Sequence, residues 1–123
     1  MELVPRFGSG ELPKEICKAI RIIEQGYRRS LLLADVAEAV GLSPSHFSHL
    51  FHASTGFTFQ EYVIRVRLEH ACELLADPEG PDVTRIALEV GLGSLRNLEQ
   101  HFHKRIGMTP SECRRRSQPD GSC

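Results

Sequence analysis

Residues 86–116 read IALEVGLGSLRNLEQHFHKRIGMTPSECRRR, and this stretch decides the fold. Its apolar residues follow helical spacing, break at Gly91 and resume in a second helix whose inner positions are Leu98 and Phe102. A chain that reverses within three or four residues favours a glycine in the left-handed conformation at the end of the first helix. A short helix, a glycine turn and a longer helix together form the sequence pattern of a helix-turn-helix.

The same pattern occurs earlier in the chain, which makes it an internal repeat. An offset of 50 residues aligns the short helices, and an offset of 51 aligns the longer ones. One residue is therefore inserted in the second turn. Two copies are too few for a solenoid, so we expect two lobes. The aligned pairs are Leu33–Val83, Val36–Ile86, Ala37–Ala87, Val40–Val90, Gly41–Gly91 and Leu42–Leu92, then Phe47–Leu98, Phe51–Phe102, Gly56–Gly107, Thr58–Thr109, Glu61–Glu112 and Tyr62–Cys113.

The predicted fold is all-α, with about seven helices in two helix-turn-helix lobes joined by a long linking helix. No stretch alternates with period two for long enough to form a strand. We expect the first lobe at residues 11–57, the linking helix at 58–76 and the second lobe at 77–116. Residues 1–10 contain LVPRFGS, which is close to a thrombin cleavage site, and are expected to be disordered or added for expression. Residues 117–123 are expected to be a disordered tail.

The composition limits the possible functions. The chain has 123 residues, enough for one domain but too few for a sensor domain and a full effector domain together. Its 15 Lys and Arg against 16 Asp and Glu give a net charge of −1, which exerts no general attraction on nucleic acid. The acid excess lies in residues 41–81, with two basic residues against five acids, whereas residues 82–123 have seven against five.

Several classes of function lack support in the sequence. No apolar run is long enough to cross a bilayer and no signal peptide is present, so we expect a cytoplasmic protein without a membrane partner. The cysteines form no close sequence pair, and no nucleophile–base pair or phosphate loop stands out, so we expect no enzyme and no cofactor. His46, His49 and His52 are spaced three residues apart, whereas ligands on a metal-binding helix are usually four apart, so no metal site is expected.

Two segments carry a family resemblance: GLSPSHFSHLFHASTGFTFQEYV at residues 41–63 and the 86–116 stretch quoted above. They resemble the DNA-binding domain of the AraC/XylS family of bacterial transcription regulators. The resemblance implies two recognition helices that enter adjacent major-groove segments of double-stranded promoter DNA, in a nucleoid-associated protein. It also implies activation through RNA polymerase more often than repression, and an N-terminal sensor or dimerisation domain outside this chain. Because family members are usually more basic, we expect weaker binding, carried mainly by the second lobe.

The residues that read bases are predicted from helical geometry and from the family's base-contacting positions. At about 100° per residue, the faces opposite the buried stripes are polar in both longer helices. Arg96 suits guanine O6 and N7, and Gln100 suits adenine N6 and N7. The alternatives are a solvated helix face or, for Arg96, a phosphate contact. The predicted base-contacting residues are Ser45, Ser48, His49, Leu95, Arg96, Glu99 and Gln100.

A second group of residues is predicted to contact phosphates through helix N-termini or positive charge. The alternative for the whole chain is a helical protein-interaction module without specific DNA binding. Salt-sensitive binding to DNA would separate these two functions, because only phosphate contacts release counterions. Cys72 and Cys113 lie on apolar faces and are expected to be small core residues. The predicted phosphate-contacting residues are Ser43, His52, Ser94, His103, Lys104, Thr109 and Arg114.

The histidines of these helices generate a prediction about pH. Protonation of histidines near the DNA backbone adds positive charge, so DNA affinity should rise as the pH falls from about 8 to about 6. Fluorescence anisotropy at constant ionic strength measures this dependence. An affinity that does not change over that range would contradict the prediction.

Overall fold

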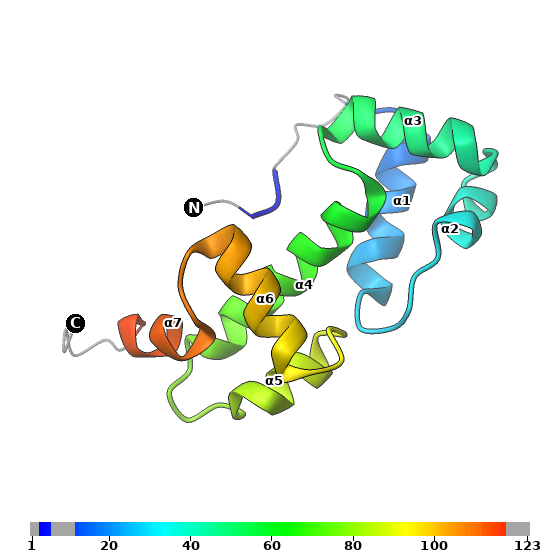
Figure 1. Cartoon of the computed structure of the whole chain (residues 1–123). Coiled ribbons are helices and arrows are strands. Elements are labelled where there is room, and N and C mark those ends of the chain that lie inside the picture. The colour runs from blue at the N-terminus through cyan, green and yellow to red at the C-terminus, as the bar shows by residue number, and fades with distance from the viewer. Residues whose placement is uncertain (1–2, 6–11, 118–123) are drawn as a thin grey trace. The chain divides into compact units, whose positions relative to one another are not determined.

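The computed structural model describes residues 3–5 and 12–117, and these form seven helices and no strand (Figure 1). This confirms the all-α prediction. The described residues fall into two compact units, the first ending at Val66 and the second beginning at Arg67. None of the described helices is long and apolar enough to span a membrane. The helices are α1 Lys14–Gly26, α2 Leu33–Ala39, α3 Pro44–Thr55, α4 Phe59–Leu75, α5 Val83–Glu89, α6 Leu95–Ile106 and α7 Pro110–Arg116.

The first unit is built around a cluster of aromatic rings. Phe47 and Phe51 of α3 lie with ring centroids 5.5 Å apart, and Tyr62 of α4 meets Phe51 edge-on at 5.3 Å. Phe59 completes the cluster at 5.8 Å from Phe47. Such edge-on pairs add about 0.5–1.5 kcal/mol each beyond the area they bury. The cluster fixes α3 against the first half of α4, while α1 packs on both α2 and α3.

The helix-turn-helix of the first unit consists of α2, a short turn and α3. Val36 and Ala37 of α2 are buried, as the repeat predicts for a short helix with one inner face. The turn passes through Gly41, whose φ of 83° is the left-handed conformation expected there. Leu42 N–H closes the turn on the Ala37 carbonyl at 2.9 Å. Leu32 precedes α2 and supplies no side-chain cap, so this helix depends on packing for its stability.

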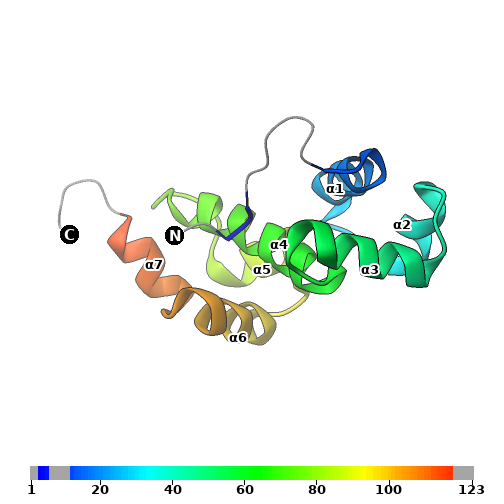
Figure 2. The same cartoon turned by 90° about the horizontal axis from the view of Figure 1, so that it is seen from above.

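The second unit repeats this arrangement with α5 and α6, and α7 follows from the C-terminal end of α6 (Figures 1 and 2). Ile86 and Ala87 are buried at the positions that correspond to Val36 and Ala37. Leu92 N–H again closes the turn on the Ala87 carbonyl, at 3.0 Å. The inserted residue is Gly93, because the N-caps Ser43 and Ser94 of the two longer helices are 51 residues apart. The change of offset is therefore confined to the turn.

The structure describes part of each chain end. Leu3 and Val4, which lie in the stretch expected to be disordered or added for expression, are only 6% and 8% exposed. The Leu3 carbonyl accepts a hydrogen bond from Arg65 Nη1 at 3.2 Å, and Arg65 also lies 4.6 Å from the Phe57 ring centroid. Ser117, placed in the predicted tail, is the C-cap of α7. Residues 1–2, 6–11 and 118–123 lie outside the described residues.

The turn geometry generates a stability prediction at Gly41. Replacement by alanine places a Cβ at a φ of 83°, and the left-handed conformation costs an L-residue about 1–2 kcal/mol. No heavy atom lies within 4 Å of the added Cβ, so the cost is conformational and not steric. Gly41→Ala should therefore lower the free energy of unfolding in urea by that amount. Gly41→Asn is the matched control and should lose less, because asparagine tolerates this conformation. Equal losses in the two variants would contradict the explanation.

Candidate nucleic-acid interface

The outer face of α3 is polar and exposed. Burial of Phe47 and Phe51 on the inner side leaves the predicted base-contacting residues Ser45, Ser48 and His49 exposed. Ser43 caps the helix by accepting a hydrogen bond from His46 N–H at 3.1 Å. The first helical residue is Pro44, which has no N–H, so this N-terminus offers a phosphate one donor fewer than an ordinary helix. The outer face of α3 therefore carries hydroxyl and imidazole groups, and the side chains near the N-terminus of the helix are short.

The outer face of α6 carries longer and more strongly polar side chains. Leu98 and Phe102 are fully buried, which leaves Arg96, Glu99 and Gln100 exposed and Leu95 partly exposed. Ser94 caps the helix by accepting from Asn97 N–H at 3.1 Å. No proline occupies the first turn, so the positive end of the helix dipole and its first N–H groups face the same region as Arg96.

Asn97 lies at the start of α6, and the sequence did not single out its side-chain contact. Its side-chain Nδ2 donates to the Leu92 carbonyl at 3.1 Å, which ties the start of α6 to the turn before it. This bond fixes the angle at which α6 leaves the turn and so positions the outer face. The signal in the sequence is its place three residues after the Ser94 cap, but that place specifies the cap bond and not the side-chain contact.

Positive charge on the described interface gathers in the last turn of α6. His103 and Lys104 are exposed there, as the phosphate-contact prediction requires. Arg105 lies in the same turn but is partly buried, with Nη1 3.0 Å from His101 Nδ1. On α3 the corresponding basic residue of the last turn is His52, which is also exposed. The imidazole of His52 corresponds to that of His103 at the offset of 51, and the second unit adds the permanent positive charge of Lys104 at the next residue, where the first unit has Ala53.

Arg114, a member of the predicted phosphate-contacting group, is bonded to another part of the second unit. Arg114 donates from Nε to the Leu75 carbonyl at 3.3 Å and from Nη2 to the Leu74 carbonyl at 3.2 Å. These carbonyls belong to the last turn of α4, so the guanidinium stabilises the end of that helix. The prediction of a phosphate contact for Arg114 is not favoured by this geometry, and we assign it a structural role.

Thr109 is engaged in the same way, within a capping box. Its hydroxyl accepts from Glu112 N–H at 3.1 Å, and its own N–H donates to Glu112 Oε1 at 2.9 Å. The bond from the Thr109 N–H is the main cause of the lowered pKa of the Glu112 carboxyl, which is therefore ionised at neutral pH. An acidic group on the α7 N-terminus repels phosphate, so the phosphate contact predicted for Thr109 is not favoured either.

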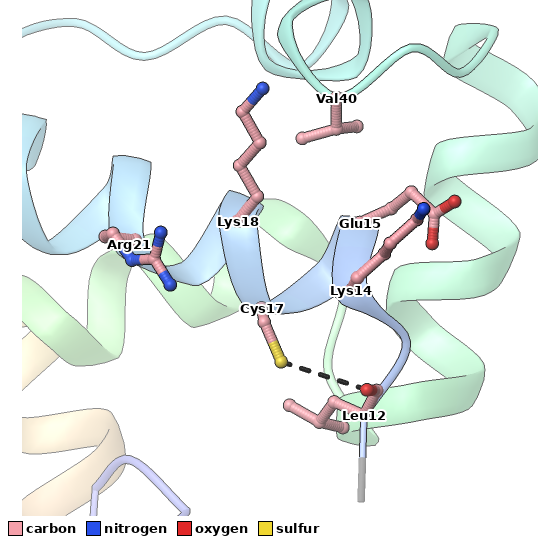
Figure 3. A pocket seen from close by; sticks show the side chains of 7 residues that line it. All are labelled: Leu12, Lys14, Glu15, Cys17, Lys18, Arg21 and Val40. Carbon is pink, nitrogen blue, oxygen red and sulfur yellow. Dashed lines mark hydrogen bonds between the residues drawn. The ribbon is translucent and has the colours of Figure 1, made fainter. Parts of the chain in front are cut away.

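A hollow lies beside α1 in the first unit (Figure 3). It has a volume of about 590 Å³ and is lined mainly by Lys14, Lys18 and Arg21, together with Glu15 and Val40. Lys14, Lys18 and Arg21 follow helical spacing on the exposed side of α1, whose opposite side buries Ile16, Ala19 and Ile23. This lining is the charged face of an amphipathic helix, and we assign no ligand to it.

Two cysteines of the second unit are partly shielded from solvent: Cys72 of α4 and Cys113 of α7 are both partly buried. Burial, followed by the influence of Cys113, raises the pKa of the Cys72 thiol to about 12. Among the described residues, no group of three or more His, Cys, Asp or Glu side chains is arranged to hold a metal ion.

Comparison with known proteins identifies the class of this fold and site. A family model described as a helix-turn-helix domain matches residues 36–116. The transcriptional regulatory protein YesN of Bacillus subtilis is 36% identical over 104 residues, which cover 82% of this chain and 28% of YesN. The melibiose operon regulatory protein of Escherichia coli K12 is 29% identical over 103 residues, covering 84% of this chain and 34% of that protein.

Solved structures agree with these sequence matches. A transcriptional regulator of the AraC-type DNA-binding class from Chromobacterium violaceum superposes with a TM-score of 0.80 at 25% identity, covering 86% of this chain and 95% of that one. The C-terminal domain of the response regulator AraT from Geobacillus stearothermophilus gives a TM-score of 0.79 at 29% identity, covering 86% and 88%. The chain belongs to the AraC/XylS family of transcription regulators and has the fold of the family's DNA-binding domain. It spans about a third of the length of the curated relatives it matches.

The contrast between Lys104 and Arg114 generates the prediction for this surface. Lys104→Ala should weaken DNA binding and lower the slope of log affinity against log salt by about one, without changing stability. Arg114→Met should instead lower the free energy of unfolding by about 1–2 kcal/mol, because two carbonyls of α4 lose a charged donor. Its salt slope should equal that of the unmodified chain. Urea unfolding and salt-dependent anisotropy measure the two quantities, and a reduced salt slope in Arg114→Met would contradict the structural role.

Proposed function

We propose that the chain regulates transcription by placing α3 and α6 in adjacent major-groove segments of promoter DNA, with α6 supplying most of the base discrimination. The observation that carries this proposal is the pair of outer helix faces, each polar and exposed directly opposite a fully buried stripe. Only α6 presents side chains suited to bidentate contacts, namely Arg96 for guanine and Gln100 for adenine. Ser45, Ser48 and His49 of α3 form single hydrogen bonds, which discriminate less.

The phosphate contacts proposed for this complex differ between the two helices. In α6 the N-terminal N–H groups, the Ser94 cap region, His103 and Lys104 all favour anions. In α3 the groups that favour anions are the Ser43 region and His52, and the N-terminus has one N–H donor fewer because Pro44 has none. Glu99 lies between Arg96 and His103 on α6 and repels phosphate, so we propose that it accepts from a cytosine amino group or stays outside the groove.

The partners of the regulator are proposed from its relatives. Transcriptional activator RhrA of Rhizobium meliloti is 37% identical over 87 residues, which supports an activating role. We propose that this role is exerted through RNA polymerase. Because the curated relatives are about three times longer, we propose that sensing or dimerisation belongs to a part of the protein outside this chain. A regulator of this kind works in the bacterial cytoplasm, where the chromosome lies.

Selection of binding sites from random double-stranded DNA tests the proposal. The chain should enrich a defined sequence, and Arg96→Ala and Gln100→Ala should each lose about 1–3 kcal/mol of discrimination at one base pair, a loss of roughly 5- to 150-fold. Arg21→Ala on α1 is the matched control: it also removes an exposed arginine, but one that lies in the hollow beside α1, so the selected sequence should not change.

Three outcomes would contradict parts of the proposal. If no sequence is enriched and DNA binding is insensitive to salt, the helical interaction module is the better description. If both α6 variants select the parent sequence, the assignment of the base-reading residues is wrong. If Arg96→Ala weakens binding to every sequence equally, Arg96 contacts phosphate and does not read a base.

A further inference from the structure

We propose that Asn97 is a positioning residue for base recognition: its side chain determines how accurately α6 presents Arg96 and Gln100 to DNA. The inference rests on the proposed function and deepens it, because it concerns how the same helix face discriminates between bases. Asn97 donates from Nδ2 to the Leu92 carbonyl at 3.1 Å, and its backbone N–H donates to the Ser94 hydroxyl at 3.1 Å. One residue therefore holds the first turn of α6 at two points.

The turn before α6 contains an added source of freedom that this bond restrains. The inserted Gly93 has a φ of 84° and follows closely on Gly91, which has a φ of 88°. Glycine restricts the backbone less than any other residue, so a turn with two glycines can vary the direction in which the helix leaves it. The Asn97 bond spans Gly93 and Ser94 and ends on Leu92, whose side chain is only 7% exposed. The start of the helix is thereby connected to a residue anchored in the core.

The repeat provides an internal comparison for this contact. At the offset of 51, His46 of α3 corresponds to Asn97, and its backbone N–H makes the equivalent cap bond to Ser43 at 3.1 Å. The turn before α3 passes through Gly41 and lacks the inserted residue. The amide side chain therefore occurs after the longer turn, on the helix that carries the side chains suited to bidentate contacts.

Loss of the Asn97 bond should affect discrimination between bases and not general affinity. A bidentate contact requires two atoms of one side chain to meet two atoms of one base at the same time, so it depends on the direction of the helix. A phosphate contact by Lys104 is an attraction to a compact charge on a flexible side chain, which tolerates a small change of direction. Freeing the first turn should therefore weaken the contacts of Arg96 and Gln100 and leave that of Lys104 intact.

Binding measurements on Asn97→Leu test the inference with three kinds of DNA: the sequence that the unmodified chain selects, its single-base-pair variants, and unrelated DNA. Leucine resembles asparagine in size and branching but has no donor. Discrimination at the base pairs assigned to Arg96 and Gln100 should fall by roughly 2- to 10-fold, the range that one hydrogen bond can supply. Affinity for unrelated DNA and its salt slope should not change. His46→Leu is the matched control and should leave discrimination at these base pairs unchanged.

A double-mutant cycle separates positioning from a general structural effect. In an Arg96→Ala background, Asn97→Leu should cause no further loss at the base pair that Arg96 reads, because the effect of Asn97 there passes through Arg96. An equal loss with and without Arg96 would overturn the inference. Asn97→Ser, whose side chain is too short to reach the Leu92 carbonyl, should reproduce the loss seen in Asn97→Leu. Either variant therefore decides the question if the other does not fold.

The remaining outcomes distinguish this inference from the proposed function. Unchanged discrimination in both Asn97 variants would overturn the inference and leave the proposed function standing. A loss confined to some other base pair would also overturn it, because Asn97 would then contact a base itself. Equal weakening on every sequence would assign Asn97 to phosphate contact instead. If the unmodified chain selects no sequence at all, the proposed function is contradicted, and this inference with it.

Discussion

The packing of each longer helix through one buried stripe is the constraint on which the rest of the structure depends. Phe47 and Phe51 in α3, and Leu98 and Phe102 in α6, are fully buried. Rotating either helix by one residue, about 100°, would expose an inner side chain and bury a polar one. The core therefore fixes which side chains face outward, and this is why Arg96 and Gln100 are presented without any bond that holds them there.

The chain has the fold of a DNA-binding domain although its net charge is −1. The distribution of its charges explains how these two properties are compatible. Association with a polyanion depends on the charges and dipoles that face it, and these are distributed unevenly. Lys104 and the open N-terminus of α6 lie on one helix of the second unit, whereas five acids fall in residues 41–81. Acids distant from the phosphates are screened over about 8–10 Å at ordinary salt, so the overall balance says little about affinity.

The fold was predictable from the sequence, while part of the candidate site was not. Helical spacing, the glycine turns and the repeat specify the helices and the outward faces, because these depend on neighbouring residues. The hydrogen bonds from Arg114 to two carbonyls of α4 and the burial of Leu3 depend on contacts distant in the sequence. The capping box at Thr109 follows from its Thr-x-x-Glu pattern, so this competing set of hydrogen bonds could be predicted from neighbouring residues.

The repeat has diverged in its outer residues much more than in its core. Val36 and Ala37 correspond to Ile86 and Ala87, yet the outward serines and histidines of α3 correspond to arginine, glutamate and glutamine on α6. A symmetric dimer reads two identical half-sites, whereas one chain with two different helix faces reads two different ones. Under the proposed function, the DNA sequence that the chain binds is therefore asymmetric. The half contacted by α6 is the more strictly specified, and the orientation of the sequence fixes the orientation of the regulator on the promoter.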